Sequence, residues 1–469
     1  MRRLAEHLFK SSDAKKVKAA GVRCRAVNSD GPTKRIAGRS RARPPAPSPW
    51  LGGSRSDLSG QRVLTHSAAW ITLSLAAIVG FVTLFAILTV SPLLTPIIDE
   101  LSLTFAEGGL LFSVLVAMIV VGALIGGYAG DRLGIRKALG SGAVLVGVGA
   151  PLRGLATGYL SLLLFMALVG LGYGFLLPNL PKLAEGWFPP KQLGVVTGVY
   201  MASLYAGAAF AISVTLPIYS ILASSWRNTL LFSGSISALV AAAWWLGARD
   251  PPSANVLNGT KGNHGEGDRV WAKGQVWLVA LLLTSMNVFF YTLGGWLPTI
   301  FVERGSSAYV GSLMASMAYF LAVPATLIIP FLSGVVGRRK PFLWILALAA
   351  AAASYGLLVA PVGFGWFLSA VLGFATSGIM VICYILPVEL FPPSALGRAS
   401  GIIVSIGFLG GIVGPFIAGL LRDETRSFAG VIILLVISAV FAAAIATPIR
   451  ETGGGGRDRV EGASTRVRF

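Results

Sequence analysis

Twelve long apolar runs follow one another between Ala68 and Ala446. Each is close to the roughly 20 residues that an α-helix needs to cross a hydrocarbon core of about 30 Å. The runs lack the alternating polarity of membrane barrel strands, so helices are the structure that satisfies their backbone groups within lipid. With 55% apolar and 12% charged residues, the chain has too little polar surface for a water-soluble fold. We predict an all-α membrane protein with spans at residues 68–91, 106–128, 138–157, 160–181, 192–216, 228–247, 274–295, 309–332, 341–360, 364–387, 396–420 and 427–447.

The chain also contains an internal duplication. Residues 188–198 read FPPKQLGVVTG, and residues 391–401, 203 positions later, read FPPSALGRASG, so six of eleven residues recur. At the same offset, the basic turn at 134–137 (GIRK) corresponds to 337–340 (GRRK). Parallel repeats of this kind build transporters around a site at the repeat interface. We therefore expect two pseudo-symmetric bundles of six helices each.

The segments outside the spans define the expected domain organisation. Residues 66–247 and 274–447 are the expected bundles, and the Pro- and Gly-containing stretch 248–273 is the expected cytoplasmic linker. Residues 1–65 carry fifteen basic and four acidic residues, which is +11 of the formal net charge of +19. We expect them to form a disordered basic tail, with a lipid-binding arm or a transit peptide as alternatives. Residues 448–469 are expected to form a disordered C-terminal tail.

The distribution of basic residues predicts the orientation. Thirteen lie in loops on one side of the predicted membrane and five on the other. The positive-inside rule then places both termini in the cytoplasm of a multi-pass protein of the cell membrane. Because the excess positive charge belongs to the tail, nucleic acid is not an expected partner. The expected partners are the lipid bilayer and a small-molecule substrate, with a coupling ion as an option, and the protein is expected to be a monomer.

The most specific motif lies between the second and third spans, where residues 126–137 read GGYAGDRLGIRK. It resembles the loop signature of the major facilitator superfamily, G-x-x-x-D-R-x-G followed by basic residues. The resemblance implies a transporter in which Asp131 is a conformational latch and Arg132 its charge-relay partner. The alternative is a loop that only anchors the topology. The second repeat has Gly334 in place of Asp131, so the latch is expected on one side only. The predicted latch residues are Gly127, Asp131, Arg132, Gly134, Arg136 and Lys137.

Two further segments narrow the resemblance. Residues 177–190 (LPNLPKLAEGWFPP) and 291–298 (YTLGGWLP) are similar to the cyanate permease and nitrate/nitrite porter branches of that superfamily. In both repeats an acid precedes the Phe-Pro-Pro break, which ends one helix before the next begins. We predict an inner gate formed by Lys182, Glu185, Glu389 and Arg398.

The resemblance leaves the substrate open. Nitrate porters hold their anion with arginines in helices 2 and 8, and the corresponding spans here contain none. Arg153, near the outer end of the third span, is the best ionisable candidate within the bilayer, either as an anion ligand or with its head at the membrane interface. The expected pocket is otherwise uncharged and aromatic. Its candidate residues are Asn287, Tyr291, Thr376, Tyr384, Tyr205 and Arg153, with interhelical hydrogen bonding as the alternative role.

These observations predict a secondary active transporter that moves a small organic solute or a monovalent anion by rocker-switch alternating access. The alternatives are a transporter-like sensor without net flux and an exporter of drugs or metabolites. The two cysteines and three histidines are not at metal-ligand spacing, so neither a metal nor another cofactor is expected. No enzyme is expected either, because the sequence has no nucleophile or phosphate-binding constellation.

Overall fold

The computed structural model describes residues 55–189, 192–251, 271 and 273–453. The chain divides into two compact units, Met1–Leu58 and Ser59–Phe469, and the membrane-spanning segments lie in the second. Twelve described helices are long and apolar enough to cross a membrane, which confirms the number of predicted spans. The helices are α2 (Arg55–Leu88), α3 (Leu94–Leu101), α4 (Phe105–Leu133), α5 (Ile135–Leu152), α6 (Tyr159–Trp187), α7 (Leu193–Ile221), α8 (Trp226–Gly247), α9 (Gly274–Glu303), α10 (Ala308–Val336), α11 (Lys340–Val359), α12 (Gly365–Leu390), α13 (Pro393–Thr425) and α14 (Ala429–Ala446), with short 3-10 turns η1 (Arg153–Leu155) and η4 (Val362–Phe364).

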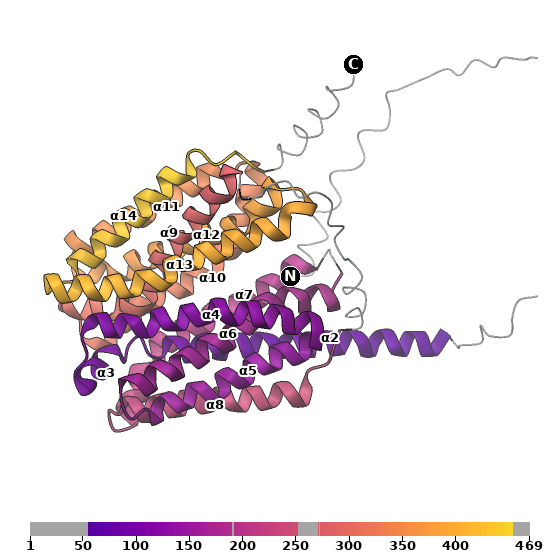
Figure 1. The fold of residues 1–469 in the computed structure, drawn as a ribbon, viewed down its shortest axis with the longest axis horizontal. Helices are drawn as coiled ribbons and strands as arrows, with labels where there is room; N and C mark the ends of the chain where they lie inside the picture. The colour runs from indigo at the N-terminus through magenta and orange to yellow at the C-terminus, as the bar shows by residue number, and fades with distance from the viewer. Residues whose placement is uncertain (1–54, 190–191, 252–270, 272, 454–469) are drawn as a thin grey trace, which may run out of the picture. The chain divides into compact units, whose positions relative to one another are not determined.

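The spans form two halves, α2 to α8 and α9 to α14 (Figure 1). In the first half α4 packs on α6 and α5 packs on α8; in the second, α10 packs on α12 and α11 packs on α14. These are corresponding helices of the sequence duplication, so the repeat recurs as repeated packing. The residue bounds of the two bundles, 66–247 and 274–447, remain a prediction.

The Phe-Pro-Pro segments end helices as predicted. α6 ends at Trp187 and α12 ends at Leu390, and the next residue in each case, Phe188 or Phe391, is extended. The first apolar run, however, ends earlier than its hydropathy indicated. α2 stops at Leu88, and the short helix α3 follows a turn that contains Pro92. Proline lacks the N–H that a helix needs and disfavours helical backbone in the residue before it, so the run is divided.

Glycines allow the helices of each half to approach closely. A Cβ added to Gly122 of α4 would lie 2.2 Å from the Leu171 carbonyl oxygen of α6. In the second half, a Cβ added to Gly373 of α12 would lie 1.7 Å from the Ala318 carbonyl oxygen of α10. Small residues serve this purpose in lipid, where close packing replaces the hydrophobic driving force between helices.

The chain stays ordered beyond two of the predicted boundaries. We expected the C-terminal tail to begin at residue 448, but Glu451 Oε1 accepts hydrogen bonds from the backbone N–H groups of Arg339 (2.7 Å) and Lys340 (3.1 Å). In the first half, Asp250 Oδ1 accepts one from Arg136 N–H at 3.3 Å. Each acid follows the last helix of its half and caps a helix N-terminus, which holds the segment in place. Likewise α2 begins at residue 55, inside the expected tail; residues 1–54, 252–270 and 454–469 lie outside the described residues.

Candidate functional site

The helices have two ends, which we name after residues of α4. The Asp131 end is where the even-numbered helices α4 to α14 finish, and the Phe105 end is where they begin. The odd-numbered helices α5 to α13 run the other way. A site halfway along the helices is therefore equally far from both ends.

Five tyrosines from five helices gather near the middle of the spans. They are Tyr173 of α6, Tyr205 of α7, Tyr291 of α9, Tyr319 of α10 and Tyr384 of α12. The other four all lie near the Tyr291 side chain. We call these residues, together with Phe290, the tyrosine cluster. The sequence predicted three of its members, whereas Tyr173 and Tyr319 were missed.

Phe290 joins the tyrosines of the two halves. Its ring centroid lies 6.2 Å from that of Tyr205 in the first half, 5.4 Å from that of Tyr291 and 5.7 Å from that of Tyr319. All three pairs are edge-to-face, the arrangement that aromatic quadrupoles favour. The cluster thus lies where the two halves meet.

Tyr384 shows that this region is open. Its exposed fraction is 43%, whereas its neighbours Met380 and Cys383 are buried. Tyr384 also lies near Tyr205 of the other half, so its side chain borders the space between the halves. The cluster contains no formal charge and presents ring faces and hydroxyl groups.

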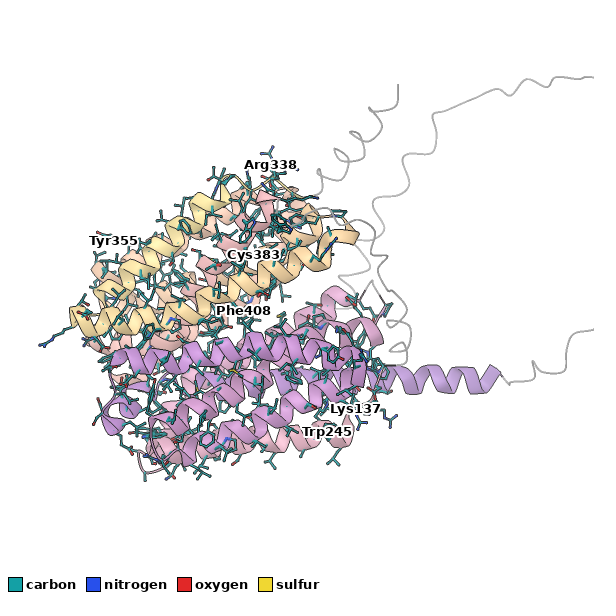
Figure 2. The ribbon with its side chains drawn as sticks, in the orientation of Figure 1. Lys137, Trp245, Arg338, Tyr355, Cys383 and Phe408 are labelled. Atoms are coloured by element: carbon teal, nitrogen blue, oxygen red, sulfur yellow. The ribbon has the colours of Figure 1, made fainter. Side chains whose placement is uncertain are left out.

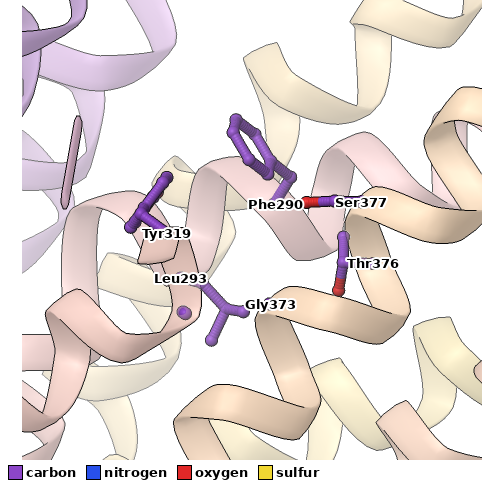
Figure 3. Close-up of a pocket in the computed structure, with 7 residues that line it drawn as sticks. Phe290, Leu293, Tyr319, Gly373, Thr376 and Ser377 are labelled. Carbon is purple, nitrogen blue, oxygen red and sulfur yellow. The ribbon is translucent and has the colours of Figure 1, made fainter. Parts of the chain in front are cut away.

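A small pocket adjoins the cluster within the second half (Figure 3). Its walls come from α9, α10 and α12 and include Phe290, Tyr319, Thr376 and Ser377. Ser377 lies near the hydroxyl of Tyr205. The predicted residue Thr376 donates its hydroxyl proton to the Leu372 carbonyl at 2.7 Å, so it is engaged within its own helix.

Two predicted substrate residues lie away from the open space. Asn287 is fully buried and donates from Nδ2 to the Gly407 carbonyl at 3.0 Å, the interhelical role named as the alternative. Arg153 is also fully buried, which contradicts the alternative in which its head reaches the membrane interface. Its Nη2 donates to the Ala86 carbonyl at 2.9 Å and its Nε to the Ala150 carbonyl at 3.1 Å. Ala86 lies in the last turn of α2, whose carbonyls need donors from outside the helix.

The predicted latch lies at the Asp131 end, with its contacts inside the first half. Asp131 forms an ion pair with Lys182 of α6, and Lys182 Nζ also donates to the Gly127 carbonyl at 3.2 Å. The Arg132 guanidinium stacks on Tyr128 at 5.2 Å. Gly134, with a φ of +94°, makes the turn between α4 and α5, where a side chain would strain the backbone. The remaining basic residues of the loop lie beside α8: Arg136 Nη2 donates to the Trp245 carbonyl at 2.9 Å, and exposed Lys137 lies at the same end (Figure 2).

The four predicted inner-gate residues do not form one cluster. Lys182 belongs to the Asp131 ion pair, and Glu389 pairs instead with Arg339 of the second half, with Oε1 2.7 Å from Nη2. Glu185 and Arg398 are exposed on α6 and α13. Each ion pair therefore stays within one half.

At the Phe105 end, by contrast, the two halves are bonded to each other. The Asp423 carboxylate of α13 accepts hydrogen bonds from the N–H groups of Phe105 (2.9 Å) and Ala106 (2.8 Å), the first residues of α4. Ser91 Oγ of the first half donates to the Gly295 carbonyl of α9 at 3.2 Å. Sequence reasoning missed Asp423, although Thr104 and Glu107 are a capping-box signal for a helix that begins at residue 105.

A second charged contact at this end lies within the first half. Glu100 of α3 binds Arg227 of α8, and Trp226 Nε1 donates to its Oε2 at 2.6 Å. The Arg227 guanidinium is the main reason that the pKa of Glu100 is below its usual value. The pair connects α3 to α8 within the first half and does not join the two halves.

The sequence and the fold are both similar to those of known transporters. The family model for the Major Facilitator Superfamily matches residues 76–353 and 302–467. The 2-nitroimidazole transporter of Escherichia coli (strain K12) is 30% identical over 362 residues, covering 75% of this chain and 89% of that protein. The cyanate transport protein CynX of the same strain is 26% identical, covering 72% of this chain and 87% of that protein.

Solved structures agree on the fold. The xylose transporter XylE from E. coli, in an inward open conformation, has a TM-score of 0.67 at 18% identity, covering 82% of this chain and 97% of that chain. Its similarity extends across both halves. The chain therefore belongs to the Major Facilitator Superfamily, as a multi-pass membrane transporter of small solutes rather than an enzyme.

Proposed function

We propose that this protein carries small, uncharged, planar organic solutes across the cell membrane by alternating access, with the tyrosine cluster as the binding site. The observation that supports this most is the convergence of aromatic rings from both halves: the Phe290 ring lies 5.4 to 6.2 Å from the rings of Tyr205, Tyr291 and Tyr319. Aromatic faces bind a flat ring by stacking, and hydroxyl groups at their edges satisfy its polar atoms. A bound carboxylate would need a cation, and Arg153 is buried elsewhere in the first half.

The relatives support the same solute class. The 2-nitroimidazole transporter, named for a small heteroaromatic ring, is 30% identical to this chain. CynX is named for an anion, so a monovalent anion is the second candidate, favoured by that relative. No carboxylate belongs to the tyrosine cluster, so a coupling ion would have to bind elsewhere.

The proposed orientation places the Asp131 end and both termini in the cytoplasm, and the protein is proposed to act as a monomer. The basic turns at 134–137 and 337–340 support this, because short cytoplasmic loops collect Lys and Arg. The bonds at the Phe105 end and the exposed Tyr384 are what an inward-open state would have. In this proposal Asp131 is released from Lys182 when the halves rock and then latches the cytoplasmic end.

Counterflow in proteoliposomes tests the function. Labelled 2-nitroimidazole should exchange rapidly, cyanate slowly, and tetramethylammonium should report whether the aromatic faces prefer a cation. The Tyr384→Phe variant should weaken solute binding about tenfold, as expected for the loss of one hydrogen bond to the solute. Tyr355→Phe is the matched control, because Tyr355 is 56% exposed on α11 and outside the cluster.

The outcomes separate the alternatives. Solute binding without exchange would favour a sensor, and exchange of cyanate alone, lost in Arg153→Gln, would favour the anion transporter. Vesicles loaded from either side, with the orientation known, distinguish uptake from export. Equal losses in Tyr384→Phe and Tyr355→Phe would remove the tyrosine cluster from the binding site.

A further inference from the structure

The Phe105 end of α4 is held by a carboxylate from the other half. Both oxygens of Asp423 are engaged, Oδ1 with Phe105 N–H at 2.9 Å and Oδ2 with Ala106 N–H at 2.8 Å. The third N–H group of the first turn, that of Glu107, donates to Thr104 Oγ1 at 3.1 Å. The backbone donors at the start of α4 are therefore shared between its own cap and Asp423.

The side chains around Asp423 also lie at the junction of the two halves. The Arg422 guanidinium, next to Asp423, lies 4.8 Å from the Phe105 ring and forms an ion pair with Glu303 of α9, with 2.9 Å between Nε and Oε2. The Phe105 ring also lies 5.8 Å from that of Trp296, which is fully buried. The negative charge of Asp423 thus faces the partly positive N-terminus of α4, where it is most stabilising.

The backbones of α4 and α13 touch at the same place. A Cβ added to Gly109 would lie 2.2 Å from the Pro415 carbonyl oxygen, and a Cβ added to Gly419 would lie 2.2 Å from the Phe105 carbonyl oxygen. A contact this close cannot persist when the two halves separate at this end. Its hydrogen bonds must therefore form and break with each exchange of conformation.

We propose that Asp423 is the positioning residue that closes the Phe105 end of the transport path, by binding the α4 N-terminus when that end is shut and releasing it when that end opens. The proposal rests on alternating access. It assigns to Asp423 a role that the predicted latch, Asp131, would have at the opposite end of the same helix. With 29 residues, α4 is about 44 Å long, so the two acids act at well separated places.

The consequence is a coupling between ends. If Asp423 stabilises the state that is shut at the Phe105 end, its loss moves the population toward the state that is shut at the Asp131 end. A carboxylate with only a local packing role would leave the distant end unchanged. Distances measured at both ends therefore distinguish the two roles.

Electron–electron distance measurements on the full chain in nanodiscs provide this test. One spin-label pair at the Asp131 end replaces exposed Lys137 and Arg338, which belong to different halves (Figure 2). A second pair at the Phe105 end replaces exposed Asn228 and Val359. Both are placed in a background with Cys24→Ser and Cys383→Ala.

Asp423→Asn keeps the shape of the side chain and removes its charge. We expect the ratio of shut to open molecules at the Phe105 end to fall about tenfold, the change that follows from losing one charge-assisted hydrogen bond. The Lys137–Arg338 distance should shorten in the same molecules. Glu424→Gln, an equal change of charge at the adjacent exposed residue, should leave both distances as in the parent protein.

Asp423→Ser is the second variant, used if Asp423→Asn does not give a monodisperse protein. Distributions like those of the parent in the folded variants, or a change at the Phe105 end alone, would overturn the proposal. If the label distances shift at both ends but no solute is exchanged, the result supports Asp423 as the gate and contradicts the proposed function. If solute is exchanged but neither distance shifts, the result supports the proposed function and contradicts the role of Asp423.

Discussion

The two halves meet along two seams that the duplication makes equivalent, α4 against α13 and α7 against α10. At the Asp131 end of the α7–α10 seam, a Cβ added to Gly198 would lie 2.8 Å from Leu327 Cδ2. The residues 203 positions away in the other seam are Gly401 and Leu124. A Cβ on Gly401 would meet nothing within 4 Å, and Leu124 is 68% exposed. One seam is therefore in contact where its counterpart is apart.

The charged groups follow the same division. Asp131 and Asp423 lie at opposite ends of the α4–α13 seam, and their counterparts in the α7–α10 seam are Gly334 and Ser220. Ser220 Oγ donates to the Pro217 carbonyl of its own helix at 2.8 Å. The duplication thus has two similar seams, of which one carries acids at both ends. We interpret α4–α13 as the seam that opens and α7–α10 as the hinge.

The largest effect on transport should come from a large side chain in place of Gly109. In Gly109→Leu the Cβ would fall 2.2 Å from the Pro415 carbonyl oxygen, so the Phe105 end of the α4–α13 seam cannot shut. We expect initial uptake in proteoliposomes to fall to about a tenth or less, as overpacking at a helix contact costs about 1–3 kcal/mol. Gly194→Leu on α7, where nothing lies within 4 Å, is the control. An equal loss of uptake in both variants would contradict the difference between the two seams.

A second substitution tests whether the Asp131 end of the α4–α13 seam closes in the other conformation. Gly401→Leu meets open space in this conformation, so the melting temperature should stay the same or rise slightly, because leucine favours a helix more than glycine does. When the Asp131 end shuts, however, residue 401 must approach Leu124 as Gly198 approaches Leu327. Transport should therefore fall about tenfold at unchanged stability, measured by uptake and thermal unfolding of the same preparation. Uptake at the parent rate would show that this part of the seam never closes.

The predicted latch should have a smaller effect. Asp131→Asn removes an ion pair whose carboxylate is 66% exposed, so stability should change by less than about 1 kcal/mol. If Asp131 stabilises the conformation in which the Asp131 end is shut, uptake should still fall about fivefold. The amount of protein in the membrane should stay constant. Uptake like that of the parent would leave the motif as a topology anchor.

The smallest effect is expected at Trp296. Its Nε1 donates to the Pro415 carbonyl at 3.1 Å, next to the contact with Gly109. Trp296→Phe removes that bond, and the shut state of the Phe105 end should lose about 1 kcal/mol. The distance distribution between labels at residues 228 and 359 measures this shift. An unchanged distance distribution would show that the backbone contacts alone stabilise the shut state.

The sequence predicted much of the fold and part of the site. Hydropathy gave the number of spans, because lipid requires about 20 apolar residues for each. Phe188 and Phe391 marked helix ends, because the prolines that follow them cannot continue a helix. Tyr205, Tyr291 and Tyr384 were predicted because each lies four residues from Met201, Asn287 or Met380 on one face of its helix. Tyr173 and Tyr319 were missed, because nothing in their own spans shows which helix face turns toward the other half.

The hydropathy of the chain thus determined a helical membrane protein of twelve spans, the recurring segments determined its duplication, and the loop motif at residues 126–137 indicated its superfamily, because each of these depends on local patterns in the sequence. Only the tertiary structure decided that Asp131 pairs with Lys182, that Arg153 is buried, and that Asp423 binds the start of α4. Asp423 and Phe105 are 318 residues apart, and their contact depends on how two whole bundles dock. A pattern of hydropathy carries no information about that docking.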